Sequence, residues 1–171
     1  GFIKGKNFDN NLEEFIQLNP KKIINTNLLI NEIINFRELG YKIFPLTDEN
    51  NIVIDIIDFN FLKSYLPVDA FIVAGGKGSR LRPLTLNTPK PLLKIGDKPI
   101  LEHNIDSLIS FGIKKIDISI KYLGNQIEEY FSDGSAKGIN IKYVKEDIPL
   151  GTIGSITKCD SFINDNILLI N

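Results

Sequence analysis

Cysteine and histidine are almost absent from this 171-residue sequence, which contains one of each, Cys159 and His103. A single cysteine cannot form an intramolecular disulfide, and a single histidine argues against a histidine-rich zinc site. The longest apolar runs, such as residues 71–74, are far shorter than the roughly 20 residues that a membrane-spanning helix needs. No secretory signal peptide begins the sequence. These absences favour a cytoplasmic protein without a membrane partner.

Methionine is also absent, and the sequence begins at Gly1, so we expect a fragment or a processed piece of a longer protein. Twenty basic and 21 acidic residues give a net charge of −1, so no global field would attract nucleic acid or anionic lipid. The hydrophobic fraction of 43% is sufficient for a buried core. Because the net charge is close to zero, any phosphate site must depend on a local cluster of positive charge.

The pattern of predicted elements changes at Leu66-Pro67-Val68-Asp69, which we interpret as a domain boundary between residues 1–67 and 68–171. The first part is predicted to be a small α+β unit. Its expected helices cover residues 12–18, 27–39 and 60–65, and its expected strands cover residues 22–24, 42–46 and 52–57.

Strands and helices alternate in residues 68–171, which is typical of a parallel sheet with right-handed crossovers. Expected strands cover residues 70–74, 115–121, 139–144 and 167–170, and expected helices cover residues 99–110, 125–131 and 153–162. The first strand is apolar without alternation, as expected for a strand covered on both faces. The pattern predicts an α/β fold with a Rossmann-like three-layer domain, and the sequence would end at a strand tip, where such sheets bind ligands.

One segment concentrates positive charge directly after the first of these strands. Residues 75–94 contain five cations and no acidic residue, namely Lys77, Arg80, Arg82, Lys90 and Lys94. Three glycines at the start of the segment allow positive φ and let backbone N–H groups approach a phosphate, and its prolines stiffen the rest. The segment therefore predicts an anion site.

Two well-known phosphate loops do not match this segment. A Walker A loop needs Lys followed by Ser or Thr, whereas Lys77 is followed by Gly78, and Phe71 stands at the place of its first glycine. The dinucleotide-binding fingerprint, started at Gly76, has Leu81 where its third glycine belongs.

The longer string does resemble the signature of the sugar-1-phosphate nucleotidyltransferase family. The matching motifs are AGGKGSRLRPLT at residues 74–85, PKPLL at 89–93, KPILE at 98–102 and EDIPLGT at 146–152. The last motif is similar to the base-recognition segment of the family, especially in its mannose-1-phosphate guanylyltransferase branch. The resemblance covers residues 68–171.

The resemblance implies that a sugar 1-phosphate oxygen attacks the α-phosphorus of a nucleoside triphosphate, with GTP favoured, and expels pyrophosphate. Arg80 and Lys90 would be the catalytic cations, since fixed positive charge stabilises the departing pyrophosphate. The implied nucleotide-binding residues are Ala74, Gly75, Gly76, Lys77, Gly78, Ser79, Arg80, Glu146, Gly151 and Thr152. The family uses Mg²⁺, and we expect its ligands after Asn171, with no metal ligand within this chain and no turnover by this chain alone.

Residues 1–67 resemble the end of one cystathionine-synthase-type (CBS) repeat followed by a nearly whole second repeat. Paired CBS repeats commonly bind adenine nucleotides, but Asp55 and Asp58 stand where a phosphate would lie and would repel it. We therefore favour a structural role or homo-oligomer formation for this region. The arrangement of a CBS region before the transferase resembles glucosamine-1-phosphate guanylyltransferases of bacterial nonulosonic acid pathways.

Two other functions stay open. A non-catalytic scaffold of the same fold would resemble the scaffold subunits of the eukaryotic translation initiation exchange factor, although a scaffold has no need for intact Gly78, Arg80 and Lys90. A nucleotide-sensing CBS protein is the other, and Asp55 and Asp58 argue against it.

Overall fold

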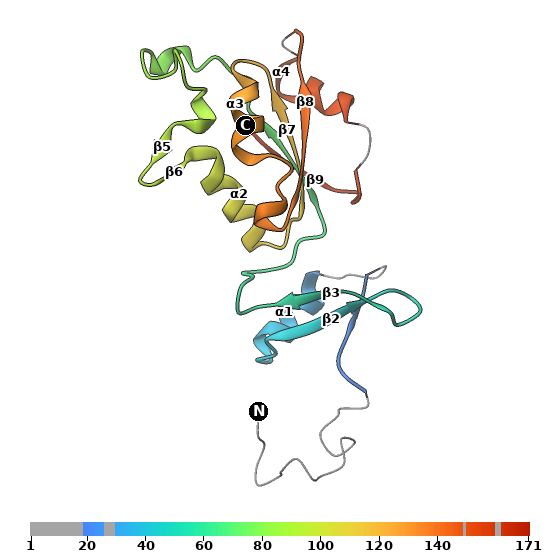
Figure 1. The fold of residues 1–171 in the computed structure, drawn as a ribbon. Coiled ribbons are helices and arrows are strands. Elements are labelled where there is room, and N and C mark those ends of the chain that lie inside the picture. The colour runs from blue at the N-terminus through green and yellow to red at the C-terminus, as the bar shows by residue number, and fades with distance from the viewer. Residues whose placement is uncertain (1–18, 26–29, 149, 160–161) are drawn as a thin grey trace.

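The computed structural model describes residues 19–25, 30–148, 150–159 and 162–171. These residues form two hydrophobic clusters, one in residues 19–67, which we call the small domain, and one in residues 68–171, which we call the sheet domain. The two domains lie one beyond the other and are joined through the end of the small domain (Figure 1). The helix predicted for residues 12–18 lies outside the described residues.

The small domain is a three-stranded sheet covered on one face by one helix. The strands β1 (Ile23–Ile24), β2 (Ile43–Thr47) and β3 (Val53–Asp58) lie in the order β1-β2-β3, with the first pair parallel and the second antiparallel. The helix α1 (Ile30–Glu38) buries Ile33 against Phe44 and Ile57. The neighbours Ile43 and Ile56 alternate with these buried residues and are exposed on the opposite face.

The helix predicted for residues 60–65 is wrong, because the chain forms only a turn there. The Asp58 carboxylate accepts hydrogen bonds from the backbone N–H and the side-chain amide of Asn60. The Lys63 N–H then donates to the Ser110 carbonyl of the sheet domain, 2.6 Å away, and does not continue a helix. A tertiary hydrogen bond therefore overrides a weak local preference.

The sheet domain contains a four-stranded sheet in which all neighbouring strands are parallel, as the alternation of elements predicts. The strands are β4 (Asp69–Val73), β7 (Lys115–Ile120), β8 (Asn140–Lys145) and β9 (Ile167–Ile170), in the order β8-β7-β4-β9. All six residues of β7 are buried, because β7 lies inside the sheet and is covered on both faces.

Two helices cover one face of this sheet. The helices α2 (Ile100–Ser110) and α3 (Gly124–Phe131) bury Leu101, Ile105 and Ile127 against the even-numbered isoleucines of β7 (Figure 1). Between β4 and α2 the chain forms the short 3₁₀ helices η3 (Ser79–Leu81) and η4 (Lys90–Leu92) and the hairpin of β5 (Lys94–Ile95) and β6 (Lys98–Pro99). A further 3₁₀ turn, η5 (Ser135–Lys137), precedes β8.

The segment between β8 and β9 covers the opposite face, so the domain has three layers. The helix predicted for residues 153–162 is much shorter than expected, since α4 (Gly151–Gly154) passes into the 3₁₀ turn η6 (Ser155–Lys158), which ends at the extended Cys159. The buried Asp69 carboxylate accepts hydrogen bonds from the backbone N–H groups of Ile163 and Asn164. These bonds hold the chain in a loop before β9.

The order of the strands reverses at β4, which has β7 on one side and β9 on the other. Open parallel sheets bind ligands outside the carboxyl ends of their strands at such a reversal. The cationic segment leaves β4 at this end.

No helix in the described part of the chain is long and apolar enough to cross a membrane.

Candidate functional site

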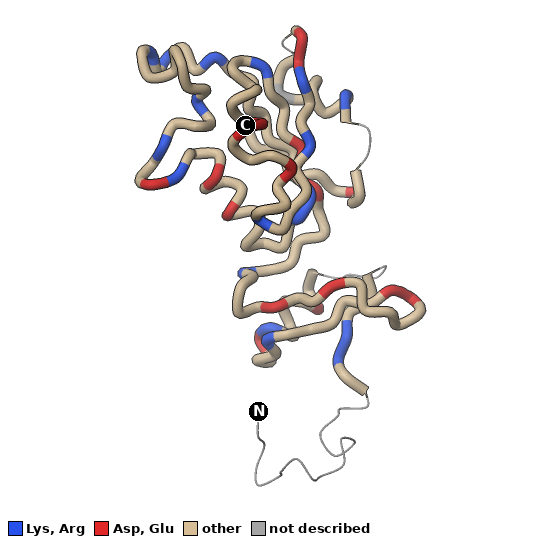
Figure 2. Tube along the Cα trace, viewed as in Figure 1, with Lys and Arg blue, Asp and Glu red and all other residues tan. Residues whose placement is uncertain are grey.

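We call residues 74–94 the signature loop, which leaves the carboxyl end of β4. Its five cations are all exposed, and none forms an ion pair with another described residue. Figure 2 shows these cations along the loop with no acidic residue between them. The loop therefore presents uncompensated positive charge at the edge of the sheet where ligands bind.

The glycines of the signature loop serve different purposes. Of the three glycines that allow positive φ, only Gly78 adopts it, with a φ of 59°. A Cβ on Gly78 would lie 3.0 Å from Thr85 Cγ2 and 3.1 Å from Lys90 Cβ, and one on Gly75 would lie 3.2 Å from Lys121 Cβ. Gly78 thus allows a tight turn. Gly75 allows the chain after β4 to pass close to the chain after β7.

Thr85 holds the two arms of the signature loop together. Its side chain is fully buried, and its hydroxyl donates to the Gly78 carbonyl over 2.9 Å. The Tyr122 hydroxyl, just after β7, donates to the carbonyls of Thr85 and Leu86 at 3.1 and 2.9 Å. Gln126 of α3 donates to the Asn87 carbonyl at 3.1 Å. The loop is therefore anchored to the sheet domain through its backbone, which leaves its cations free to meet a ligand.

A cavity of about 440 Å³ lies beside the loop, between the carboxyl ends of β4, β7 and β8. Its lining includes Gly75, Gly76, Lys77, Lys121, Tyr122, Glu146 and Gly151. A second cavity of about 240 Å³ is lined by residues that include Ala74, Gly76 and Lys90. Gly76 borders both cavities, so the loop separates two adjoining spaces.

The structure thus brings together most of the residues that the sequence predicts for the site. Gly78, Ser79 and Arg80 are the exceptions, since they line neither cavity; Ser79 and Arg80 lie in η3, and Gly78 is its N-cap. Thr152 belongs to α4, and its side chain is not among those described. Sequence reasoning missed Lys121 and Tyr122, although their position directly after a buried parallel strand was a signal for ligand contact.

Glu146, directly after β8, is placed in the cavity wall by contacts to β7 and to the segment before α4. Its backbone N–H donates to the Ile120 carbonyl at 3.0 Å, and the Ser119 hydroxyl donates to one carboxylate oxygen. The other oxygen accepts the Leu150 N–H at 3.3 Å. A carboxylate has about four acceptor positions, so Glu146 keeps capacity for a ligand. Lys121, which also lines the cavity, donates to the Asp147 carbonyl at 2.8 Å.

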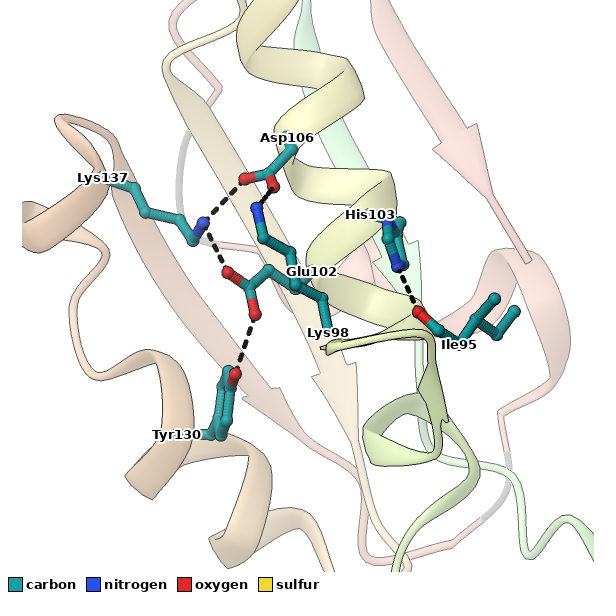
Figure 3. A network of polar contacts seen from close by, with 7 residues as sticks. All are labelled: Ile95, Lys98, Glu102, His103, Asp106, Tyr130 and Lys137. Atoms are coloured by element: carbon teal, nitrogen blue, oxygen red, sulfur yellow. Dashed lines mark hydrogen bonds and ion pairs between the residues drawn. The ribbon is translucent and has the colours of Figure 1, made fainter.

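A polar network connects β6 and η5 to α2 (Figure 3). Lys98 of β6 pairs with Asp106 of α2 at 2.8 Å, and Lys137 of η5 bridges Asp106 and Glu102 at 2.7 and 2.8 Å. The Tyr130 hydroxyl of α3 donates to the second Glu102 oxygen at 2.8 Å. We call these five residues the α2 network. Next to it, His103 Nε2 lies 2.9 Å from the Ile95 carbonyl oxygen.

The α2 network shifts the pKa values of its members. Hydrogen bonds from Lys137 and then Tyr130 lower the pKa of Glu102 below its usual 4.5. Burial acts to raise the pKa of Asp106, but the hydrogen bonds from Lys137 and Lys98 outweigh it and lower this pKa. The hydrogen bond to Asp106 raises the pKa of Lys98. The network thus keeps its carboxylates ionised and its lysines protonated.

The described residues do not form a metal site. No three or more His, Cys, Asp or Glu side chains among them are grouped in a way that could hold an ion. The one carboxylate on the cavity beside the loop, Glu146, already accepts two hydrogen bonds. These residues therefore do not fit Mg²⁺ by themselves, because Mg²⁺ favours octahedral oxygen ligands.

Comparison with known proteins gives consistent results for the sheet domain. A family model described as nucleotidyl transferase matches residues 69–170. The mannose-1-phosphate guanylyltransferase of Mycobacterium tuberculosis is 42% identical over 105 residues, which are 61% of this chain and 29% of that protein. The mannose-1-phosphate guanylyltransferase catalytic subunit beta of Danio rerio is 38% identical over 98 residues, which are 57% and 27% of the two chains.

Among solved structures, a putative glucose-1-phosphate thymidylyltransferase from Bacillus anthracis is 30% identical to this chain. The match covers 54% of this chain and 38% of that one, with a TM-score of 0.49. The chain spans less than a third of the length of the two curated relatives above.

Proposed function

We propose that this chain, which belongs to the nucleotidyl transferase family, holds the nucleotide in an enzyme that joins a nucleoside triphosphate to a sugar 1-phosphate. The observation that carries the proposal is the signature loop, with five exposed cations that have no ion-pair partner in the described chain. Unpaired cations on an anchored loop suit a ligand with several negative charges.

In the proposed reaction, an oxygen of the sugar 1-phosphate attacks the α-phosphorus, and the bond to the bridging oxygen of pyrophosphate breaks. Negative charge then builds up on the departing pyrophosphate. Arg80 would hold the β- and γ-phosphates and stabilise that charge, and Lys90 would contact phosphate oxygens near the α-phosphorus. Backbone N–H groups of residues 75–79 would complete the cradle, since Gly78 permits the turn that the loop makes.

The favoured nucleotide is GTP. Guanine offers two neighbouring N–H donors, at N1 and N2, to which a carboxylate can bind, whereas adenine does not. Glu146 is the carboxylate on the cavity beside the loop, and Gly151 lies near it. The two curated relatives are named guanylyltransferases, which supports the same choice. Mannose 1-phosphate or a hexosamine 1-phosphate such as glucosamine 1-phosphate would be the second substrate.

Further parts of the proposal concern the whole protein. We place it in the cytoplasm, with a Mg²⁺ requirement met by ligands other than the described residues. The small domain, with its CBS-like sequence, would form homo-oligomers through the face that exposes Ile43 and Ile56, whose exposed fractions are 56% and 58%. Sedimentation velocity of wild type and an Ile43→Asp, Ile56→Asp variant tests this, and equal sedimentation coefficients would refute it.

A non-catalytic scaffold of the same fold is the alternative. The unpaired cations of the signature loop argue against it, because an exposed cluster of like charges is unfavourable without an anion.

The experiment is an assay of pyrophosphate release by the longer protein that carries this chain. Each of GTP, ATP, UTP and CTP would be combined with mannose, glucose and glucosamine 1-phosphates. We expect release to require both substrates and to be fastest with GTP, and a Glu146→Gln variant to lose the preference for GTP. Release without a sugar phosphate would indicate hydrolysis, and no release with any pair would favour the scaffold.

A further inference from the structure

The junction between the small domain and the sheet domain contains a partly open cavity of about 730 Å³, which the proposed reaction does not use. It lies at the amino ends of β4, β7 and β8, where Asp69, Lys115 and Asn140 line it. The signature loop is at the carboxyl ends of the same parallel strands, about 20 Å away for a six-residue strand. The two sites are therefore separate.

Specific contacts hold the two domains together around this cavity. Besides the bond from Lys63, the Leu66 N–H donates to the Phe111 carbonyl at 2.9 Å. Asp55 of β3 forms an ion pair with Lys114, next to β7, at 2.5 Å. Gly112 meets Tyr65 so closely that a Cβ there would lie 2.8 Å from the ring. The cavity therefore has walls from both domains.

The charges in this cavity leave one cation in excess. Lys114 is paired with Asp55, and the buried Lys115 lies 3.6 Å from Asp69. Lys142 of β8 also lines the cavity, is exposed, and forms no ion pair or hydrogen bond within the described residues. Among the residues that line the cavity, three lysines thus stand against two aspartates. The buried Asp117, behind this lining, lies 3.9 Å from Lys115 and interacts with Lys142, and burial raises the pKa of its carboxyl.

The remaining walls suit an organic molecule. Ile54, Val68 and Ile139 contribute aliphatic surface, and Tyr65 contributes a ring. The volume falls within the roughly 300–1,000 Å³ that is usual for small-molecule sites, and such sites combine apolar walls with a few polar groups. An inorganic ion alone would leave most of this space unfilled.

From this arrangement we infer that the junction cavity binds a small phosphorylated metabolite, whose phosphate is held by Lys142 with Lys114 and whose body lies against Tyr65 and Ile54. The ligand contacts both domains, so its binding stabilises their arrangement. Asp55 competes with the phosphate for Lys114. This site goes beyond the proposed function, and it neither requires nor excludes nucleotide transfer at the signature loop.

Isothermal titration calorimetry of the 171-residue chain tests the inference with glucose 6-phosphate, inorganic phosphate and glucose. We use an Arg80→Ala, Lys90→Ala background so that the signature loop contributes little. The phosphate ester is expected to bind more tightly than inorganic phosphate, and glucose is expected not to bind. Failure of both phosphates to bind at millimolar concentration, or equal binding of glucose, would overturn the inference.

Two variants in that background identify the site. Lys142→Gln is expected to weaken binding of glucose 6-phosphate about tenfold, as loss of one charged hydrogen bond typically does. Asp55→Asn breaks the ion pair between the domains but keeps both lysines, and it is expected to bind the ester at least as tightly as the background. Lys142 makes no ion pair, so its variant should fold, which circular dichroism would verify. Unchanged affinity in Lys142→Gln would contradict the assignment.

Discussion

The signature loop and the α2 network differ in whether their cations form ion pairs, although Lys94 and Lys98 are only four residues apart. The loop leaves Lys77, Arg80 and Lys90 without ion pairs among the described residues, whereas Lys98 and Lys137 each contact a carboxylate within 2.8 Å. The ion pairs of the α2 network hold its elements in place, whereas the unpaired cations of the loop are available to bind an anion. Substitutions in the two regions should therefore affect different measurements.

The largest effect is expected for Arg80→Ala. Loss of a charged contact to the triphosphate should weaken GTP binding by roughly 10- to 100-fold. The free energy of unfolding should change little, because Arg80 is exposed and has no ion pair within the described residues. Calorimetric titration and thermal unfolding measure the two quantities. Lys21→Ala, an exposed cation of the small domain, is the control, and an equal loss of GTP affinity there would indicate nonspecific attraction.

Gly78→Ala is expected to weaken GTP binding about tenfold. Alanine in the left-handed region costs about 1 kcal/mol, and its Cβ would also press on Thr85 and Lys90. Gly96→Ala is a matched control, because Gly96 also has a positive φ, of 69°, but a Cβ there meets nothing within 4 Å. Both variants should lose stability from backbone strain, Gly78→Ala more because of its added contacts, and only Gly78→Ala should lose affinity for GTP. Equal GTP affinities of the two variants would show that GTP binding does not depend on the turn at Gly78.

Thr85→Val should have a smaller effect on GTP binding and a clear effect on stability. Valine removes the hydrogen bond from the Thr85 hydroxyl to the Gly78 carbonyl, which still accepts the Leu81 N–H, and loss of one such hydrogen bond costs about 0.5–1.5 kcal/mol. Thr85→Ser keeps the hydroxyl and should restore the GTP affinity. Chemical denaturation and GTP titration of both variants provide the comparison. If serine and valine were equally weak binders, packing of the methyl group and not the hydrogen bond would hold the loop.

The smallest effect on nucleotide binding is expected for the α2 network, which should instead control acid stability. The lowered pKa values mean that Glu102 and Asp106 stabilise the fold fully above their usual values of 4.5 and 3.8, and that this stabilisation is lost as the pH falls through the lowered values. Glu102→Gln should therefore reduce the difference in melting temperature between pH 6 and pH 3. These two pH values are about 1.5 units from the usual pKa of a glutamate.

Glu32→Gln is the control for that measurement, since Glu32 is an exposed helical residue without an ion pair in the described chain. It should leave the acid dependence unchanged. GTP affinity at neutral pH should be the same in both variants. A loss of affinity in Glu102→Gln would mean that the network positions the loop, and it would erase the distinction between the two regions.

The sequence predicts the sheet domain well because its information there is local. Apolar strands such as residues 70–74, and the cations and glycines of the loop, are visible without any contact information. What it fails to predict depends on partners far along the chain. The turn at residues 60–65 forms because Lys63 bonds to Ser110, and the role of Thr85 becomes clear only when Tyr122 is placed beside it.

The same limit applies to the other predictions. The pairing of Asp55 with Lys114 joins residues 59 apart in the sequence, so inspection of the CBS-like region alone could not assign it. The domain boundary and the roles of Arg80, Lys90 and Glu146 stay predictions.

Whether the signature loop binds the triphosphate is tested by comparing the affinities for GTP and GMP. Calorimetric titration of the chain and of an Arg80→Ala, Lys90→Ala variant gives four affinities. We expect GTP to bind much more tightly than GMP to the unchanged chain, and we expect the variant to lose most of this advantage while its affinity for GMP changes little. An equal advantage of GTP in both proteins would contradict this expectation.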